Sequence, residues 1–388
     1  MSRPIPEPVE MLRELVALPS VSSTDARLDQ PNRPVIDRLA EWAEALGFRA
    51  DVQPLPGDGR KANLVATLGE GDEAGLVLSG HSDTVPYDEG AWGADPFELT
   101  ERGDRLVGLG AADMKGFFAA ALAAVQQARG TELRRPLTLV ATADEESGMA
   151  GGKALAGAGG LKAQAAVIGE PTSLRPVCAH KGIAMAALHL LGRSGHSSDP
   201  ALGVSALEGM YDGMDEILRF RAEVQHRHRD DRFSVPVPTL NLGRIHGGDS
   251  PNRICPSCEL SFDLRNPPGV DADHLLEELD DRLRARLDGS GLDIRLRALV
   301  DTIPAFETPR GAAIVRAAEE ATGLEPVAVL FATEGPYFRA LGIETVILGP
   351  GDIAVAHQPE EYVTRGDLER ASGIYEQLIH RFCMEGAS

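Results

Sequence analysis

Residues 76–86 read LVLSGHSDTVP, an apolar run followed at once by two side chains of metal-ligand type. A continuous apolar run is typical of a strand buried on both faces, as in a sheet covered by helices on either side. His81 and Asp83 follow the run directly. Because an imidazole and a carboxylate at the end of a buried strand need polar or metal partners, the stretch predicts an α/β sheet whose strand end carries a functional site.

Three further apolar runs predict strands of the same sheet. They are NLVATL from residue 63, LTLVATA from residue 137 and AAVIG from residue 165. In residues 35–46 apolar side chains recur at helical spacing, and this repeat stops at Gly47, where a helix C-cap belongs. The alternation of helical and strand patterns indicates an α/β sheet covered by helices on both faces.

The pattern changes at about residue 180. Residues 180–299 predict a strand, a helix, two strands, a helix and a strand, which is the βαββαβ order of a ferredoxin-like unit. The α/β pattern then resumes with a helix, the strand TVILGP from residue 345 and a terminal helix. We therefore expect one α/β domain built from residues 1–179 and 300–388, interrupted by a smaller domain at residues 180–299.

The composition argues against several classes of partner. The chain carries 38 basic and 59 acidic side chains, for a formal net charge of -21, whereas a nucleic-acid binder needs a basic face. The first residues show no secretion signal, and the longest apolar run, residues 117–125, is too short to span a bilayer. Four cysteines fit a reducing compartment. We expect a soluble, cytoplasmic protein that binds neither nucleic acid nor membranes.

Cys255 and Cys258 have a Cys-x-x-Cys spacing. The sequence offers no second pair to complete a four-thiolate zinc site, although a redox or metal role stays open. We interpret the two residues as thiols at neighbouring positions of a strand.

Side chains of ligand type follow the predicted strands that start at residues 76, 137, 165 and 345. They are His81, Asp83, Glu145, Glu146, Glu170 and His357, and Asp113 stands in a glycine-rich turn before the apolar helix. Taken singly, each has a structural explanation as a satisfied polar group, a helix cap or a solvated charge. Because binding crevices of α/β sheets lie outside the carboxyl ends of the strands, their recurrence there favours one shared site.

Several carboxylates in one cleft repel each other unless cations are present. Two histidines and three carboxylates, one of them bridging, form a suitable donor set for a pair of zinc ions, and cobalt or manganese also suits such ligands. Asp83 is too close to His81 in sequence to bind the same ion independently, and it fits an acceptor that orients the His81 ring. The sequence thus predicts a dinuclear metal site.

Two other hypotheses find less support. GLGAAD at residues 108–113 imitates the start of a dinucleotide-binding fingerprint, but the third glycine is absent. The Gly-x-Ser-x-Gly motif of serine hydrolases does not occur in the sequence.

Seven stretches occur in one order along nearly the whole chain: GHSDTVP, GLGAADMKG, ATADEESGMAG, GEPTSLRPV, SGHSSDPALG, GGDSPNRI and AHQPEEY. Together they resemble the dinuclear-zinc metallopeptidase family that includes acetylornithine deacetylase, succinyl-diaminopimelate desuccinylase and carboxypeptidases of the glutamate-releasing type. They look closest to acetylornithine deacetylase. The resemblance implies a zinc-aminopeptidase-like catalytic domain, in which helices flank a mixed sheet. It also implies that a ferredoxin-like domain interrupts this domain and serves as lid and dimerisation domain.

The resemblance also implies a ligand set for two divalent metal ions, zinc in the first place and cobalt as an alternative. His81 and Glu170 would hold one ion, Glu146 and His357 the other, and Asp113 would bridge both.

Three further residues would take part in catalysis by this resemblance. Glu145 would be the general base that takes a proton from water and passes it to the leaving amine, and Asp83 would orient a ligand. His196 corresponds to a histidine that relatives supply from the partner subunit's inserted domain to stabilise the oxyanion, so we expect a homodimer through residues 180–299. Alternatively, His196 caps the turn and helix that follow it.

Asn252 and Arg265 resemble residues with which relatives grip the substrate, Asn252 near the scissile carbonyl and Arg265 on the α-carboxylate. The alternatives are a turn residue for Asn252 and a surface salt bridge for Arg265. Lys181 and Thr333 are further candidates of the same type.

The expected reaction is hydrolysis of N2-acetyl-L-ornithine to L-ornithine and acetate, a step of arginine biosynthesis in relatives. An N-acetylcitrulline deacetylase or another N-acyl-L-amino acid deacylase fits the same motifs, because the catalytic residues recognise the amide and not the side chain. A catalytically inactive metal-binding or interaction protein is the alternative of another class. The presence of all five ligand positions and of Glu145 argues against it.

Overall fold

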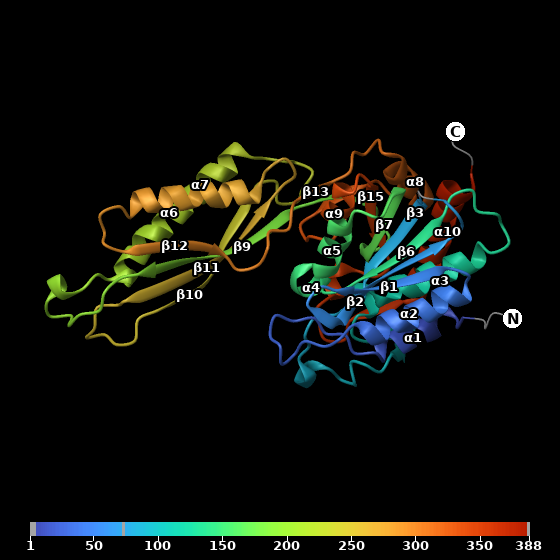
Figure 1. Cartoon of the computed structure of the whole chain (residues 1–388), viewed down its shortest axis with the longest axis horizontal. Coiled ribbons are helices and arrows are strands. Elements are labelled where there is room, and N and C mark those ends of the chain that lie inside the picture. Colours follow the sequence, from blue (N-terminus) through green and yellow to red (C-terminus); the bar gives the residue numbers. More distant parts are fainter. Residues whose placement is uncertain (1–4, 72–73, 386–388) are drawn as a thin grey trace. The chain divides into compact units, whose positions relative to one another are not determined.

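The computed structural model describes residues 5–71 and 74–385 (Figure 1). The chain divides into two compact units. The first comprises the residues up to 178, residues 308–327 and the residues from 333 onward, and the second comprises residues 179–307 and 328–332.

Most of the first unit is built around a mixed sheet with the strand order β1-β2-β6-β3-β7-β15-β8-β13, in which β14 also pairs with β8. Strand β13 and parts of β8 and β14 consist of residues that belong to the second unit. The strands are β1 (Arg49–Leu55), β2 (Asp58–Leu68), β3 (Ala74–His81), β6 (Leu137–Thr142), β7 (Ala163–Pro171), β8 (Val177–His180), β13 (Phe306–Glu307), β14 (Val327–Val329) and β15 (Glu344–Gly349). Strands β6, β3, β7 and β15 run parallel to their neighbours in this series, whereas β1, β2 and β6 pair antiparallel. The predicted mixed sheet flanked by helices is confirmed.

Helices cover both faces of this sheet. They are α1 (Pro8–Val16), α2 (Arg33–Ala45), α3 (Gly116–Gln127), α4 (Glu145–Gly148), α5 (Ala150–Ala158), α8 (Ala313–Thr322), α9 (Gly335–Ala340) and α10 (Arg365–Ile379). The main core lies between one sheet face and α1, α2, α3, α8 and α10. Helix α3 is apolar on nearly all sides because it lies inside this layer, where Phe117 contacts the ring of Tyr375 edge to face.

The registers of the central strands place their carboxyl ends at one edge of the sheet. His81, the last residue of β3, pairs with Thr142 at the end of β6, and Ser79 pairs with Ile168 of β7. Residues that follow β3, β6 and β7 therefore start from neighbouring points, as expected for a site at the carboxyl edge of an α/β sheet.

A small three-stranded sheet of the first unit holds the turn that precedes α3. Its order is β16-β5-β4, with β4 (Thr100–Arg102), β5 (Arg105–Val107) and β16 (Tyr362–Thr364). All pairs are antiparallel, and Tyr362 lies opposite Val107. This pairing brings the segment before α10 alongside the segment that leads into α3.

The second unit is a four-stranded antiparallel sheet with two helices on one face (Figure 1). Its elements are β9 (Gly182–Leu191), α6 (Ala206–Arg227), β10 (Thr239–Gly247), β11 (Ser257–Asn266), α7 (Ala272–Arg286) and β12 (Asp293–Ala298). Burial alternates along β11, because every second side chain faces the helices. The element order βαββαβ and the strand order β10-β11-β9-β12 are those of the ferredoxin-like unit that the sequence predicts.

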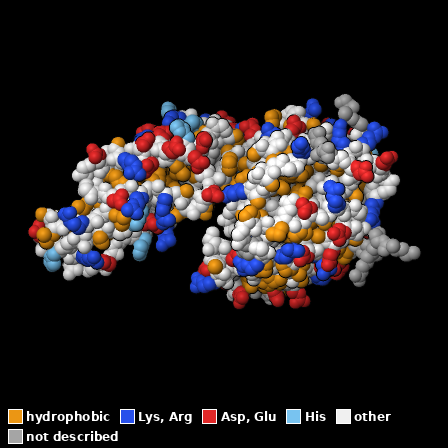
Figure 2. All heavy atoms as spheres, in the orientation of Figure 1, with side chains coloured by type: hydrophobic (Ala, Val, Ile, Leu, Met, Phe, Trp, Pro, Cys, Tyr) orange, Lys and Arg blue, Asp and Glu red, His pale blue; other side chains and the backbone are white. Residues whose placement is uncertain are grey.

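Two further observations concern the surface and the cysteines. Lys and Arg side chains are interspersed with Asp and Glu side chains over the visible face (Figure 2). Among the described helices, none is long and apolar enough to cross a bilayer. All four cysteines are buried thiols. Cys258 lies in β11, but Cys255 precedes the strand and its Sγ contacts the carbonyl of Ser257 at 3.1 Å, so the interpretation of both as strand residues holds only for Cys258.

Candidate metal centre

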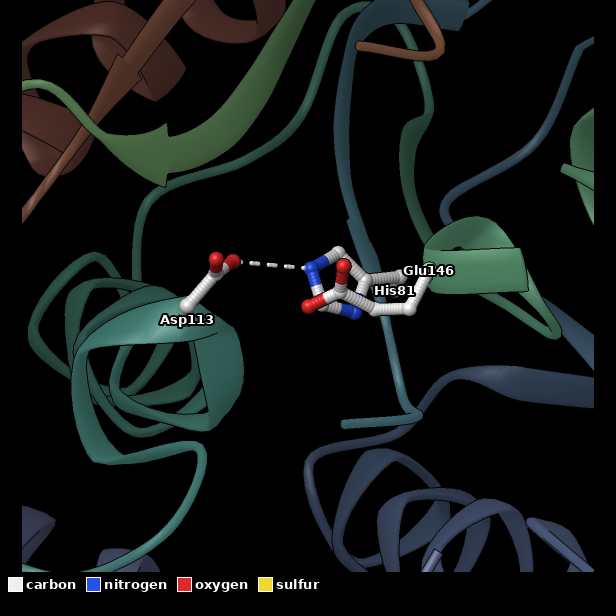
Figure 3. Close-up of side chains that lie close together, drawn as sticks. All are labelled: His81, Asp113 and Glu146. Atoms are coloured by element: carbon white, nitrogen blue, oxygen red, sulfur yellow. Dashed lines mark hydrogen bonds and ion pairs between the residues drawn. The ribbon is translucent and has the colours of Figure 1, made fainter. Parts of the chain in front are cut away.

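Three side chains from three separate elements meet at the carboxyl edge of the sheet (Figure 3). His81 ends β3, Asp113 lies in the turn Ala111–Lys115 before α3, and Glu146 lies in the short helix α4 that follows β6. One ligand atom of each residue lies within 4.8 Å of the others. An imidazole nitrogen and two carboxylate oxygens at such distances are a donor set for a divalent metal ion.

The two nitrogens of His81 have different partners. Nε2 lies 3.0 Å from Asp113 Oδ1 and 3.9 Å from Glu170 Oε2. Nδ1 lies 3.0 Å from the main-chain oxygen of Asp83, closer than the carboxylate Oδ1 of the same residue at 3.7 Å. A proton on Nδ1 that is donated to this carbonyl leaves Nε2 directed at the carboxylates, which is the tautomer that a metal ligand needs.

Asp113 lies between two imidazoles. Its Oδ1 faces His81, and its Oδ2 lies 3.3 Å from Nε2 of His357. The same nitrogen of His357 lies 3.1 Å from Glu146 Oε1. Each oxygen of Asp113 thus serves a different histidine, an arrangement that suits a carboxylate bridging two ions.

The electrostatics of this cluster indicate a deficit of positive charge. Burial and the charge of Glu170 raise the pKa of Glu145 well above its ordinary value, and burial and the charge of Asp113 do the same for Glu170. Hydrogen bonds with Asp113 and Glu146 raise the pKa of His357 to about 10. Without metal, protons on the acids and imidazoles supply the positive charge that the carboxylates require.

The histidine and carboxylate donors fit a pair of metal ions on two grounds. The pKa of Asp113 is lowered, because its hydrogen bonds to His357 and His81 outweigh the effect of burial, so this carboxylate stays ionised between the imidazoles. Glu170 Oε1 is buried and has no hydrogen-bond partner within the described residues, which is unusual for a carboxylate oxygen unless it binds a cation. Nitrogen and oxygen ligands of this kind are those of zinc and related metals.

Asp83 connects this cluster to the turn after β6. Its side chain is fully buried, Oδ1 lies 3.3 Å from the backbone nitrogen of Glu145, and Oδ2 accepts the backbone N–H of Glu146 at 3.1 Å. The carboxylate therefore fixes the backbone from which Glu145 and Glu146 extend. Sequence reasoning assigned Asp83 to the His81 ring, and this second set of contacts was not predicted.

The turn after β6 also takes part in an ion pair with a buried lysine. Lys61 of β2 is 2% exposed, and its Nζ lies 2.6 Å from Asp144 Oδ1 and 2.8 Å from Asp29 Oδ1. Asp144 has a left-handed backbone (φ 57°) and also accepts a hydrogen bond from Ser22. Sequence analysis did not single out Lys61, because its partners lie far away along the chain.

Glu334 is a buried carboxyl that sequence reasoning missed. It is 1% exposed, Oε2 accepts a hydrogen bond from Thr142 at 2.7 Å, and burial raises its pKa to about 7. The predicted substrate residue Thr333 precedes it, is fully buried, and accepts the backbone N–H of Gly335 through Oγ1 at 3.1 Å.

The remaining predicted residues lie in the second unit, and their roles toward a substrate stay predictions. His196 is hydrogen-bonded through Nδ1 to Ser198 Oγ at 2.7 Å, which agrees with the alternative of a turn cap. The loops of His196 and Asn252 are adjacent, because the backbone nitrogen of Ser197 donates to the carbonyl of Asn252 at 3.2 Å.

Arg265 and Lys181 have partners inside their own unit. The guanidinium of Arg265 forms a double contact with the carboxylate of Asp263, with Nε–Oδ1 at 2.8 Å and a terminal nitrogen to Oδ2 at 2.9 Å. Lys181 is buried and donates through Nζ to the carbonyl of Val237 at 2.6 Å.

Comparison with known proteins agrees with this fold. Residues 77–381 match the family described as Peptidase family M20/M25/M40, which covers most of the chain, and the protein belongs to this family of hydrolases. Among solved structures, a tripeptidase from Staphylococcus aureus aligns with a TM-score of 0.76 at 20% identity, over 97% of this chain and 98% of that one.

Two other solved structures share the fold. An M20 family metallo-carboxypeptidase from Sulfolobus solfataricus has a TM-score of 0.73 at 20% identity and covers 97% of this chain and 99% of its own. A dinuclear metal binding M20 peptidase from Bacillus subtilis has a TM-score of 0.66 at 15% identity and covers 96% of both chains. At these identities the matches show a common architecture along nearly the whole length.

Proposed function

We propose that the protein is a dinuclear, zinc-dependent amidohydrolase that removes the acetyl group from N2-acetyl-L-ornithine in the cytoplasm, as a step of arginine biosynthesis. The observation that carries the proposal is the position of Asp113, whose two oxygens face His81 and His357 separately. The choice of substrate is supported by the seven sequence stretches that resemble acetylornithine deacetylase.

In this proposal Asp113 is shared by two ligand pairs. His81 and Glu170 form one pair, and Glu146 and His357 form the other. The contacts His81–Glu170 (3.9 Å) and His357–Glu146 (3.1 Å) support this division. When bound, the two ions would supply Lewis acidity that polarises the scissile amide carbonyl and makes water more acidic.

Glu145 is the proposed general base. Its neighbours Glu146 and Glu170 are assigned to metal binding, whereas a carboxylate that is not coordinated keeps the basicity that proton transfer requires. A carboxylate oxygen of Glu145 would accept a proton from the attacking water and deliver it to the amine nitrogen of ornithine. Asp83 holds the backbone of Glu145, so the position of the base is fixed before the substrate arrives.

The second unit would supply the substrate contacts. Asn252 would bind near the scissile carbonyl and Arg265 would bind the α-carboxylate. Lys181 of the same unit is a further candidate, and so is Thr333, which lies in the first unit. Because Arg265 is already paired with Asp263, the substrate carboxylate would have to join or replace that partner.

A homodimer through the second unit is part of the proposal, because His196 would act in the site of the other subunit. Helix α6 offers a suitable surface. Leu207, Tyr211 and Leu218 follow one another at helical spacing and are 51%, 76% and 37% exposed. An exposed apolar stripe of this kind is typical of an interface with another protein surface.

The test combines metal analysis with initial rates. The purified protein should contain two divalent ions per chain and hydrolyse acetylornithine, and chelation should abolish turnover until zinc or cobalt is restored. Rates on acetylcitrulline and succinyl-diaminopimelate serve as the comparison. A large preference for either would replace the proposed substrate with another N-acyl-L-amino acid, whereas metal binding without any hydrolysis would favour the inactive, metal-binding alternative.

A further inference from the structure

Glu361 is a buried carboxyl to which neither the motifs nor the ligand set assigns a role. It is 1% exposed and receives three backbone N–H groups of the turn that carries Asp113. Oε2 accepts from Gly110 at 3.0 Å, and Oε1 accepts from Ala112 at 2.8 Å and from Asp113 at 2.9 Å. One side chain therefore satisfies most of the free backbone donors of this turn.

These three hydrogen bonds take the place of helical backbone hydrogen bonds, which the turn does not form. Asp113 has φ -120° and ψ 87°, which lie outside the helical region, so its N–H is not part of an ordinary helical ladder. Gly110 has φ 76°, and a Cβ at this position would lie 2.6 Å from Thr84 Cγ2. The backbone of the turn is thus held from outside, because buried N–H groups need acceptors.

The position of Glu361 is itself fixed by the small three-stranded sheet. Tyr362 pairs with Val107, and the backbone nitrogen of Gly108 donates to the carbonyl of Glu361 at 3.0 Å, which extends the ladder by one step. The side chain of Glu361 therefore starts from a point beside the turn that it binds.

The same segment also carries His357. Glu361 follows His357 closely in the sequence, and His357 Nε2 lies 3.3 Å from Asp113 Oδ2. The segment therefore contacts the Asp113 turn twice. The imidazole of His357 contacts the side chain of Asp113, and the carboxyl group of Glu361 contacts backbone N–H groups of the turn. A displacement of the turn would change the distance between Asp113 and both of its histidines.

We propose that Glu361 is a positioning residue of the metal centre: its carboxylate holds the backbone of the Gly110–Asp113 turn so that the Asp113 side chain presents one oxygen to each imidazole. The inference rests on the metal centre of the proposed function and does not depend on the identity of the substrate. Residues that orient metal ligands from behind typically change metal affinity about 10- to 100-fold when they are replaced.

Glu361→Gln is the variant that tests this role, because it keeps the size of the side chain but turns one acceptor oxygen into an NH2 group facing a backbone N–H. The adjacent Glu360→Gln is a matched control, since Glu360 contacts the guanidinium of Arg102 and the N–H of Gly93 on the surface. Zinc affinity is measured by competition with a chromogenic chelator, in the absence of substrate. The visible absorption of the cobalt-loaded protein reports the ligand arrangement.

The expected result for Glu361→Gln is a loss of zinc affinity of about 10- to 100-fold and a changed cobalt spectrum, with both properties unchanged in Glu360→Gln. Thermal unfolding of the metal-free proteins separates this effect from a general loss of stability. Zinc affinity within twofold of the wild type, even with a lower melting temperature, would show a merely structural role and overturn the proposal.

Glu361→Asp provides a second variant that retains a carboxyl group and withdraws it by one methylene. It should also bind zinc less tightly than the wild type, because the shorter side chain cannot reach all three N–H groups. If neither variant folds without metal, Glu361 is a folding residue and the proposal fails. Wild-type protein that binds zinc but does not hydrolyse acetylornithine would overturn the substrate assignment alone.

Discussion

The carboxylate of Asp83 accepts the backbone N–H of Glu146 at 3.1 Å, and the carbonyl of the same residue lies 3.0 Å from Nδ1 of His81. Asp83 thus connects two candidate ligands from different elements, His81 at the end of β3 and Glu146 in helix α4. Asp83→Asn would place an amide NH2 group where one of the two backbone N–H groups needs an acceptor. We expect a decrease in zinc affinity of about 10- to 100-fold, measured by chelator competition. An affinity equal to that of the wild type would show that the ligands hold their positions without Asp83.

Glu145 and Glu146 are adjacent but should respond differently to the same substitution. Glu145→Gln should lower kcat about 100- to 10,000-fold while the protein still binds two ions, because it removes only the proton acceptor. Glu146→Gln should lower the metal content as well. Atomic absorption and steady-state rates on acetylornithine distinguish the two variants. Normal turnover by Glu145→Gln would eliminate Glu145 as the base.

The buried ammonium of Lys61 contacts Asp144 at 2.6 Å and Asp29 at 2.8 Å. Lys61→Met would leave both carboxylates without their buried counter-charge, so we expect a loss of about 3–5 kcal/mol in the free energy of unfolding. Urea unfolding measures this loss. Lys162→Met, which removes an exposed lysine, is the control and should change stability by less than about 0.5 kcal/mol. Similar curves for the two variants would refute the role of the ion pair.

Burial raises the pKa of Glu334 to about 7 from its ordinary value of 4.5. Between pH 4.5 and about 7, Glu334 of the folded, metal-free protein therefore keeps its proton, whereas Glu334 of the unfolded chain releases it. The stability that Glu334 contributes is full below pH 4.5 and is lost as the pH rises through about 7. Relative to Glu334→Gln, the wild type should lose up to about 3 kcal/mol of unfolding free energy over this range. Parallel pH profiles in urea unfolding would show that Glu334 titrates normally.

If His196 acts in the site of the other subunit, two inactive variants should restore activity when they are mixed. His196→Ala and Glu145→Gln homodimers each lack one catalytic group. Reassembled heterodimers contain one complete site, so random pairing should recover about a quarter of the wild-type rate. Activity that stays at the level of the separate variants after verified subunit exchange would place His196 outside the catalytic reaction.

The sequence predicted those parts of the site that follow from strand ends. His81 and Glu146 could be placed together because β3 and β6 are apolar runs with clear ends, and parallel neighbours end at the same edge. The ferredoxin-like order of the second unit was readable because strands and helices alternate there with distinct periodicities.

Contacts that depend on a precise three-dimensional approach were not predictable in this way. The partners of Glu361 are backbone N–H groups, which have no signature in a sequence, and the partners of Lys61 lie on distant segments. The contact of His81 with the carbonyl of Asp83, which is closer than the contact with the Asp83 carboxylate, was also not predicted, because main-chain atoms are the same at every position. The roles of His196, Asn252 and Arg265 remain predictions, because they concern a substrate or a partner subunit and not contacts within their own unit.

Strand β15 lies between β7 and β8 in the sheet. It consists of residues 344–349 and therefore comes much later in the sequence than both of these neighbours. During synthesis on the ribosome, the edge of β7 must therefore stay unpaired while the whole inserted unit is translated, and an open apolar edge of this kind attracts other chains. His357 emerges later still. If His357 holds the second ion as proposed, a nascent chain can acquire that ion only at the end of translation, and products truncated before that point should aggregate instead of capturing metal.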